Sequence, residues 1–478
     1  MKKNLIYIVS LLIILFFRFI PAIPGVTASG MQVLGIFLGV LILWLTVAID
    51  WPSLLAIVAL TFVPELTVNS VLANSLGNST FAFLLFTFMC TYAVSKTSFI
   101  KRSAIAFISN RLALKGSWWF VTLYCLSVLT IGLFVSPVVL FVIYMPILDT
   151  ICKELKLEKG DKLASTLSLG QMFSCAFSCG MTPIAHIFPV MALGFYQQAT
   201  GKMISYTSYM AFGIPVGIIS FIIMMLLFKF FLNPDMSKLK NMDLSSLKAE
   251  IQPMEKREKW ILGIFFIVVS LWILPEFVKP IFPSFAAFLS KKGTAFPPML
   301  GAVAMFIISI NGKPLLDFKE TLTKGIQWGS VIMAGATLAL GTAMTNKEVG
   351  LTEWLSGSIE PLIANLTPVL IILVIIAWAA IMTNVASNMV TVTVVCAVAI
   401  PIALSSGGSI NAPAIASIIG MIASYAFVTP PAHPNVALAI GSGWTTTSQT
   451  LKYGTILMVI SIIASMVVGY PIASALMV

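Results

Sequence analysis

Long apolar stretches recur from one end of this 478-residue chain to the other. Most are long enough for an α-helix to cross the hydrocarbon core of a bilayer, and they include residues 31–49, 205–231, 260–274, 364–382 and 453–475. Hydrophobic residues make up 59 % of the chain and charged residues only 9 %, whereas a soluble protein of this length needs far more surface charge. The sequence therefore predicts an all-α polytopic membrane protein.

The basic residues gather in short loops between the apolar stretches. The formal net charge is +11, which in a soluble protein would suggest nucleic-acid binding. Clusters in short loops are instead typical of the positive-inside bias, so we expect membrane lipid as a partner and no nucleic acid. The start MKKNLIYIVSLLIILFF resembles a signal peptide, but no small-residue cleavage site follows it. We expect an uncleaved first helix and a multi-pass protein of the cell membrane, of the bacterial plasma-membrane type.

One polar segment interrupts the chain near its middle. Residues 233–259 hold six Lys or Arg and five acidic residues and have almost no apolar run. This composition indicates a solvated, cytoplasmic linker, which could include a helix on the membrane surface. It predicts an N-terminal membrane repeat over 1–232 and a C-terminal membrane repeat over 260–478. Two halves of equal length are typical of transporters built from internal repeats.

The two halves contain matched motifs. TPIAHIFPVMALG begins at Thr182, and TPPAHPNVALAIG begins 247 residues later at Thr429. The only histidines of the chain, His186 and His433, occupy the same place in these motifs. About fifty residues upstream, each half has a second polar element, FVSPVVLF over 134–141 and TNVASNMV over 383–390. Each half therefore pairs a polar element with a helix that a Thr-Pro sequence breaks.

Broken helices suit anion binding. A polar interruption of a membrane helix is tolerated only where it lines a cavity or is buried in protein. The half-helix after the break points free N–H groups and a partial positive charge toward the gap, so two such ends could bind an anion without Lys or Arg. A lone Ser or Thr usually bonds back to its own helix, and a membrane histidine can simply bridge two helices. The symmetric arrangement favours a binding site over these structural roles.

These motifs resemble a known family. SNM at 387–389, within TNVASNM, is similar to the Ser-Asn-Thr signature of the divalent anion/sodium symporter family, and SYAFVTPPAHPN at 424–435 is similar to its downstream segment. The resemblance implies a homodimer of inverted repeats, with about eleven transmembrane helices and two re-entrant helical hairpins in each subunit. It also implies a transport domain that moves like an elevator against a scaffold. The implied substrates are C4–C6 carboxylates such as succinate, malate, 2-oxoglutarate and citrate, or sulfate.

The resemblance also implies which residues form the site. It places the substrate carboxylates between the two signature elements and the inner ends of the broken helices, and sodium beside the second element. The expected sodium ligands are Thr383 and Asn388. The expected substrate-binding residues are Ser136, Pro137, Val138, Thr182, Pro183, Ser387, Asn388, Met389, Thr429 and Pro430.

The chain departs from the family pattern in its first half. The first signature reads Ser136-Pro137-Val138, and Gly132 stands where a hydroxyl is expected. A hard cation needs several oxygen ligands, and imidazole is a poor replacement. We expect His186 and His433 to compensate the charge of a buried dicarboxylate instead of sodium, since an unpaired buried charge is very costly. This favours sodium-independent exchange. The alternatives are a sodium-coupled symporter and a carrier of another anion such as sulfate.

Other functional classes fit less well. The sequence has no HExxH, GxxxxGK[ST] or GxSxG motif, and its six cysteines lack metal-type spacing. We therefore expect no enzyme and no cofactor, with sodium only as a coupling ion. A channel would need a pore lined by rings of like residues, whereas this chain offers one pseudo-symmetric site. The sequence leaves open which carboxylate is carried, how transport is coupled, and whether the first signature still contacts substrate.

Overall fold

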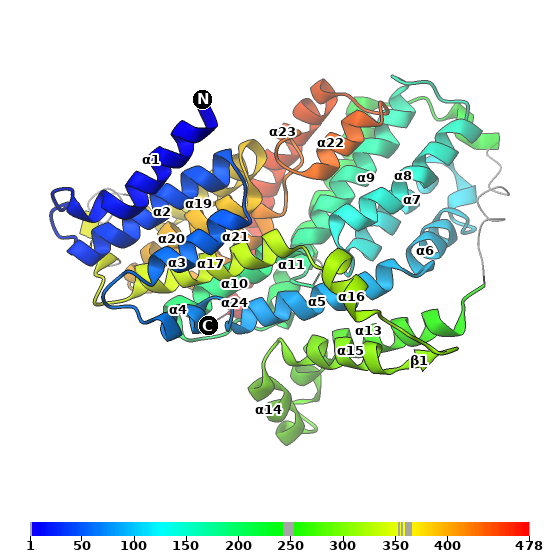
Figure 1. Cartoon of the computed structure of the whole chain (residues 1–478). Coiled ribbons are helices and arrows are strands. Elements are labelled where there is room, and N and C mark those ends of the chain that lie inside the picture. The colour runs from blue at the N-terminus through cyan, green and yellow to red at the C-terminus, as the bar shows by residue number, and fades with distance from the viewer. Residues whose placement is uncertain are drawn as a thin grey trace.

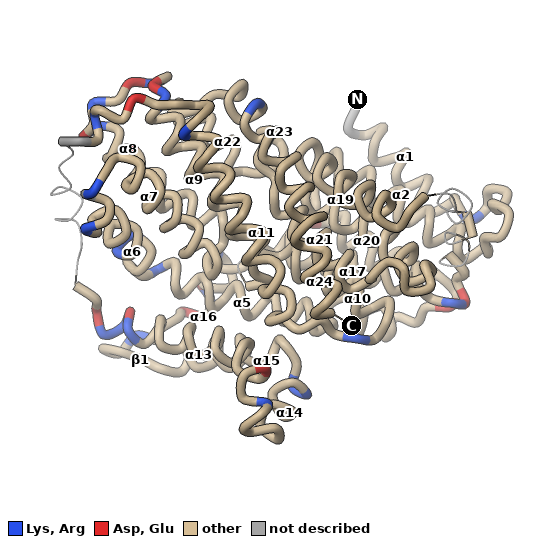
Figure 2. Tube along the Cα trace, turned by 180° about the vertical axis from the view of Figure 1, so that it is seen from behind, with Lys and Arg blue, Asp and Glu red and all other residues tan. Residues whose placement is uncertain are grey.

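The computed structural model describes residues 2–184, 186–241, 253–351, 354, 357–358 and 366–477. Helices dominate these residues, and the two strands β1 (Ser309–Ile310) and β2 (Lys313–Pro314) form one short antiparallel hairpin (Figure 1). The prediction of an all-α polytopic membrane protein is confirmed. Figure 2 shows that charged residues gather at the periphery, in loops and on outlying helices such as α6 and the start of α13, while the helices in the middle of the molecule carry almost none.

The N-terminal half contributes eleven helices within the described residues. They are α1 (Lys2–Phe16), α2 (Ala28–Thr46), α3 (Trp51–Leu60), α4 (Val68–Asn74), α5 (Ser79–Ser95), α6 (Phe99–Ile108), α7 (Ser117–Gly132), α8 (Pro137–Glu154), α9 (Lys162–Met181), α10 (Ile187–Thr200) and α11 (Tyr206–Leu227). A π-helical turn, Phe228–Leu232, extends α11 and ends at the left-handed Asn233.

The described C-terminal half begins inside the predicted linker. A 3₁₀ turn spans Ser237–Asn241, residues 242–252 lie outside the described residues, and α13 already starts at Lys256. The helices are α13 (Lys256–Val278), α14 (Pro283–Lys292), α15 (Phe296–Ile307), α16 (Phe318–Glu320), α17 (Trp328–Thr345), α19 (Pro368–Val385), α20 (Asn388–Ser405), α21 (Ala412–Ala423), α22 (Pro434–Gly441), α23 (Thr447–Ala464) and α24 (Tyr470–Leu476). Residues 364–365 of the apolar stretch 364–382 also lie outside the described residues.

The number of membrane spans depends on how short helices are counted. Among the described residues, seven helices are long and apolar enough to cross a membrane, or eight if the bent pair α4 and α5 is one span. Five further apolar helices have only 10–17 residues, which is too short to cross alone. The eleven transmembrane helices expected from the resemblance lie between two counts for the described residues. These are the seven or eight full-length helices, and the larger number reached when the five short helices are included.

The same sequence of elements occurs in each half. A hairpin, α7–α8 or α19–α20, is followed by a broken helix, α9/α10 or α21/α22. The half-helices pack across the two halves, because α10 contacts α20 and α21, and α22 contacts α8 and α9. In Figure 1, α9 and α22 lie toward the top and α10 and α21 lie lower, so the two broken helices run in opposite directions. This crossing brings both breaks to one place.

Candidate anion site

A cavity of about 250 Å³ lies where the two halves meet. The four helices that follow the matched motifs begin at its wall, namely α8 and α10 of the first half and α20 and α22 of the second. The structure brings most of the predicted site residues together there: Ser136, Pro137, Val138, His186, Ser387, Asn388, Met389 and His433 all line the cavity. Among the described residues, no Lys, Arg, Asp or Glu does so.

The residue that caps each of these helices has extended backbone angles. Ser136 precedes α8 with φ −52° and ψ 133°, and Ser387 precedes α20 with φ −129° and ψ 132°. His186 precedes α10 and His433 precedes α22 in the same manner, with ψ 147° and 141°. The first N–H groups of a helix have no partner within it, and the helix dipole adds partial positive charge at that end. Four such ends around one cavity make it attractive to an anion.

The two threonines of the Thr-Pro motifs do not line this cavity. The Thr182 hydroxyl donates to the carbonyl of Leu133 at 2.8 Å, and the Thr429 hydroxyl donates to the carbonyl of Asn384 at 2.6 Å. Both carbonyls lie at the end of the first helix of a hairpin, so each threonine fixes its hairpin to the neighbouring break. Pro183 borders a small adjoining cavity, and Pro430 precedes Pro431, which does line the main one.

Asn384 is a structural residue that the sequence motifs do not predict. Its side-chain oxygen accepts the N–H groups of Phe427 and Val428, each at 2.9 Å, and its amide nitrogen donates to the carbonyls of Tyr425 and Ala380, each at 2.9 Å. The buried amide therefore satisfies the unwound backbone before α22. An asparagine in an otherwise apolar stretch is the signal that could have found it. Leu133 occupies the matching position in the first half.

The two imidazoles lie close together. Their ring centroids are 6.1 Å apart. The Nδ1 atom of His186 lies 3.2 Å from the hydroxyl of Ser424, and the Nδ1 atom of His433 accepts the N–H of Asn435 at 3.1 Å. Both rings border the cavity, so the matched histidine motifs do converge on one site.

The predicted sodium ligands occupy different environments. Asn388 lines the cavity and is buried, and its side-chain oxygen has no hydrogen-bond partner among the described residues. Thr383 is fully buried away from the cavity and donates to the carbonyl of Ala423 at 2.8 Å. In the first half, the carbonyl of Pro137 accepts from the amide of Asn435 at 3.2 Å and from the thiol of Cys175 at 3.4 Å. This carbonyl is thus engaged by donors from within the protein.

Four lining residues lie outside the repeated motifs. Ile49, Phe88, Gln327 and Ser330 come from the segment before α3, from α5 and from the start of α17. No sequence signal marks them, because they belong to parts of the two halves that show no matched motif.

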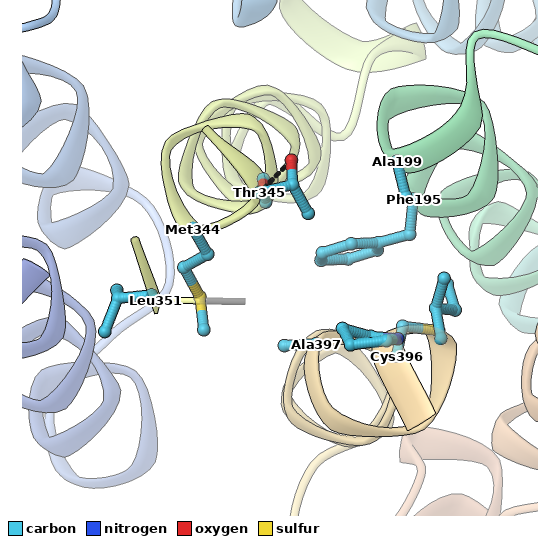
Figure 3. Close-up of a pocket in the computed structure, with 10 residues that line it drawn as sticks. Phe195, Ala199, Met344, Thr345, Leu351, Cys396 and Ala397 are labelled. Atoms are coloured by element: carbon cyan, nitrogen blue, oxygen red, sulfur yellow. Dashed lines mark hydrogen bonds between the residues drawn. The ribbon is translucent and has the colours of Figure 1, made fainter. Parts of the chain in front are cut away.

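A second pocket lies farther along α10, toward its C-terminal end, and is almost wholly apolar. Figure 3 shows Phe195 and Ala199 of α10 facing Met344 and Thr345 of α17, with Cys396 of α20 below. Its one hydroxyl, on Thr345, already donates to the carbonyl of Gly341 at 2.9 Å. Among the described residues, no hydroxyl, amide or charged side chain of this pocket is left free to bind an anion. It marks instead the seam between α10 and α17.

Glycines lie at the contacts between the two helices of that seam. A Cβ atom on Gly341 of α17 would lie 2.8 Å from the ring of Phe195, and a Cβ atom on Gly194 of α10 would lie 2.8 Å from Leu338. The hydroxyl of Thr342 also donates to the side chain of Gln198 across the seam at 2.8 Å. At these two positions a side chain of one helix therefore packs directly against the backbone of the other.

Comparison with solved structures places the fold among membrane transporters. The YdaH transporter of Alcanivorax borkumensis superposes with a TM-score of 0.56 at 12 % identity, over 84 % of this chain and 86 % of that one. MtrF of Neisseria gonorrhoeae, described as an antimetabolite efflux pump, superposes with a TM-score of 0.53 at 13 % identity, over 84 % of each chain. At these identities the likeness concerns the fold alone.

Sequence relatives cover nearly the whole chain. The sodium-dependent dicarboxylate transporter SdcS of Staphylococcus saprophyticus is 26 % identical over 92 % of this chain and 86 % of its own length. SdcS of Staphylococcus aureus is also 26 % identical with the same coverage, and an uncharacterised transporter of Haemophilus influenzae is 25 % identical over 98 % of this chain and 97 % of its own.

The family model described as the sodium:sulfate symporter transmembrane region matches residues 1–478. The resemblance noted in the sequence is thereby confirmed over the full length. The chain is a multi-pass membrane transporter of the cell membrane and belongs to the sodium:sulfate symporter family.

Proposed function

We propose that this chain is a secondary active transporter of C4–C6 di- or tricarboxylates that works by elevator-type alternating access. The observation that carries the proposal is the cavity at which four helices begin and which no charged side chain lines among the described residues. Carboxylate oxygens are strong acceptors, and N–H and O–H donors at helix starts match them. The dicarboxylate named for the SdcS relatives supports this choice of anion over sulfate.

The moving part would comprise the two hairpins and the two broken helices, in the proposed halves 1–232 and 260–478. The fixed part would comprise α2, α3, α5 and α17, with a second copy of the chain against it in a homodimer. The moving part and the fixed part would slide past each other at the seam between α10 and α17, where glycines lie at the contacts. A cavity with lining residues from both parts supports this division, because substrate access would change as one part moves past the other.

For coupling, we propose sodium-independent exchange in which the histidines compensate the substrate charge. A dicarboxylate inside the membrane needs positive charge nearby, and the imidazoles are the only side chains at the cavity, within the described chain, that can acquire it near neutral pH. The engaged carbonyl of Pro137 and the absence of a hydroxyl at Gly132 support the loss of a cation site in the first half.

Sodium-coupled symport is the second candidate function. The name of the SdcS relatives favours it, and so does the buried side-chain oxygen of Asn388, which has no partner among the described residues and suits a cation.

Uptake of radiolabelled succinate into proteoliposomes tests both candidates. Vesicles are either empty or preloaded with unlabelled succinate, each with and without an inward sodium gradient. Exchange predicts uptake only into preloaded vesicles and no effect of sodium, whereas symport predicts sodium-driven uptake into empty vesicles. Asn388→Ala should lower uptake in either case, and Ser270→Ala, which removes an exposed hydroxyl on α13, is the matched control. If succinate is not carried under any condition but sulfate is, the substrate proposed here is wrong.

A further inference from the structure

We propose that the two histidines have unequal roles: His186 takes up the proton that accompanies the substrate, and His433 stays neutral as the cap of α22. This inference rests on the proposed function, because it assigns the charge compensation of the cavity to one ring. The matched positions of the two histidines in sequence hide the difference, which lies in what each Nδ1 atom contacts.

His433 is held as an acceptor. Its Nδ1 atom accepts the N–H of Asn435 at 3.1 Å, its carbonyl accepts the N–H of Val436 at 3.0 Å, and Pro434 between them has no N–H. An imidazole that accepts at Nδ1 carries its single proton on Nε2. A second proton would have to go on Nδ1, where it would face the N–H of Asn435 and leave that donor without a partner. The cap of α22 therefore opposes a charged ring.

For His186 we infer the donor role. Its Nδ1 atom lies 3.2 Å from the oxygen of Ser424, and the same hydroxyl donates to the carbonyl of Gly420 at 3.1 Å. A hydroxyl has one proton, so while Ser424 donates to Gly420 its oxygen accepts from Nδ1–H of His186. The Nε2 atom then keeps its lone pair, and a proton can bind there without breaking either of these hydrogen bonds. The N–H bond forms at Nε2, and the neutral ring becomes imidazolium.

The surroundings of His186 make uptake of this proton depend on a bound anion. His186 stands at the start of α10, where the helix dipole disfavours a cation. The described groups that face the ring are Ser136 at the hairpin tip, Thr87 and Thr91 of α5, Ser424 after α21, and His433. None of these except His433 titrates, and the Cys179 thiol borders only the neighbouring cavity on the His433 side. A carboxylate in the cavity supplies the compensating negative charge, so substrate and proton bind together and leave together, and in the proposed exchange the carrier crosses the membrane only in this loaded state.

Nitrogen NMR tests the assignment on the intact protein. Because the chain has only two histidines, ¹⁵N-histidine labelling gives one pair of ring signals for each. We expect one ring to remain the Nε2–H tautomer from pH 9 to pH 6, and its signals to disappear in His433→Asn. The signals that disappear in His186→Gln should start as the Nδ1–H tautomer, titrate, and shift their titration to higher pH when succinate is added. Titration of the His433 ring, or of both rings, overturns the proposal.

Transport kinetics give a second readout. With wild-type protein, the KM for succinate should rise with pH, up to about tenfold per pH unit above the titration of the ring. His186→Gln should make KM independent of pH. His433→Asn keeps an acceptor for the N–H of Asn435, since asparagine is a favoured cap, and should keep the pH dependence. The opposite pattern, or the same behaviour in both variants, overturns the unequal roles. If wild-type protein carries no dicarboxylate at all, the proposed function fails, while the NMR titration still decides which ring takes up the proton.

Discussion

The first and second halves form their helix breaks with the same kind of threonine-to-carbonyl hydrogen bond. They differ in the side chains that they place at the break and at the cavity. Thr182 and Thr429 each donate to the carbonyl at the end of a hairpin's first helix, and His186 and His433 each precede a new helix. The second half adds two amides, Asn384 under the break and Asn388 at the cavity. The first half has Leu133 and Pro137 at the matching positions.

This difference separates the groups that maintain the shape of the site from the groups that can contact a substrate. The shape depends on backbone carbonyls and on threonine hydroxyls, which both halves retain. The amide donors depend on side chains that only the second half has. We infer that the second half supplies the amide contact to the substrate, while the first half supplies backbone N–H groups from α8 and α10 and the ring of His186.

The largest expected effect comes from comparing Asn388 with Val138. Asn388→Ala removes an amide that borders the cavity, and loss of a hydrogen bond to a charged group should lower kcat/KM for succinate by about 10- to 100-fold. Val138→Ala, near the matching position of the first half, should change it by less than about threefold. Uptake kinetics in proteoliposomes measure both. Equal losses in the two variants would mean that the halves contribute alike.

An effect of similar size, on stability and not on transport, is expected where a charge pair joins the halves. Arg102 of α6 donates both ends of its guanidinium to Glu258 of α13, at 2.8 and 2.9 Å, and the pair is mostly buried. Arg102→Met leaves a buried carboxylate without this partner and should lower the free energy of unfolding by about 3 kcal/mol. Denaturant unfolding in detergent measures the loss. The double variant with Glu258→Met should recover part of it, and no recovery would point to another role for Arg102.

The two threonines should behave alike in spite of their different halves. Thr182→Val and Thr429→Val each remove a hydroxyl of similar shape and leave a carbonyl unpaired, which should cost about 1–2 kcal/mol of unfolding free energy. Thr150→Val, which removes a hydroxyl whose exposed hydrogen bond goes to the carbonyl of Pro146 in its own helix, is the control and should cost little. A much larger loss in one half than in the other would break the structural equivalence of the two breaks.

The smallest effect concerns the exposed contact between α5 and the α16 segment. The hydrogen bond from Lys96, and next that from Tyr92, lower the pKa of Glu320 from its ordinary value of 4.5. Because the folded pKa lies below the unfolded one, the stabilisation is complete above about pH 4.5 and is lost as pH falls through the lower folded pKa. Lys96→Met should therefore lower the unfolding midpoint slightly at neutral pH, and by progressively less as the pH falls below 4.5. An effect that does not shrink as the pH falls would contradict the charge-based explanation.

The sequence predicts this site to the extent that the site is built from repeated backbone breaks. Proline, threonine and histidine at matched positions mark where helices end and restart, so Ser136, Ser387 and the two histidines could be placed at one cavity. The roles of Thr182 and Thr429 could not be predicted, because their acceptors lie 45–49 residues away in the chain. Asn384 and Gln327 were missed for a related reason, since a single polar residue shows its contacts only after folding.

Through the seam with α17, the helix α10 connects the cavity to the interface between the two proposed parts. The helix begins at the cavity beside His186. It packs against α17 at Gly194 and Phe195, about 12 Å farther along the axis of a regular, stiff helix. In the proposed elevator movement, a displacement of α10 at the cavity would therefore also displace it at the seam. The ring of Phe195 would have to leave its contact with Gly341, so this contact would favour discrete positions of α10 over a continuous range.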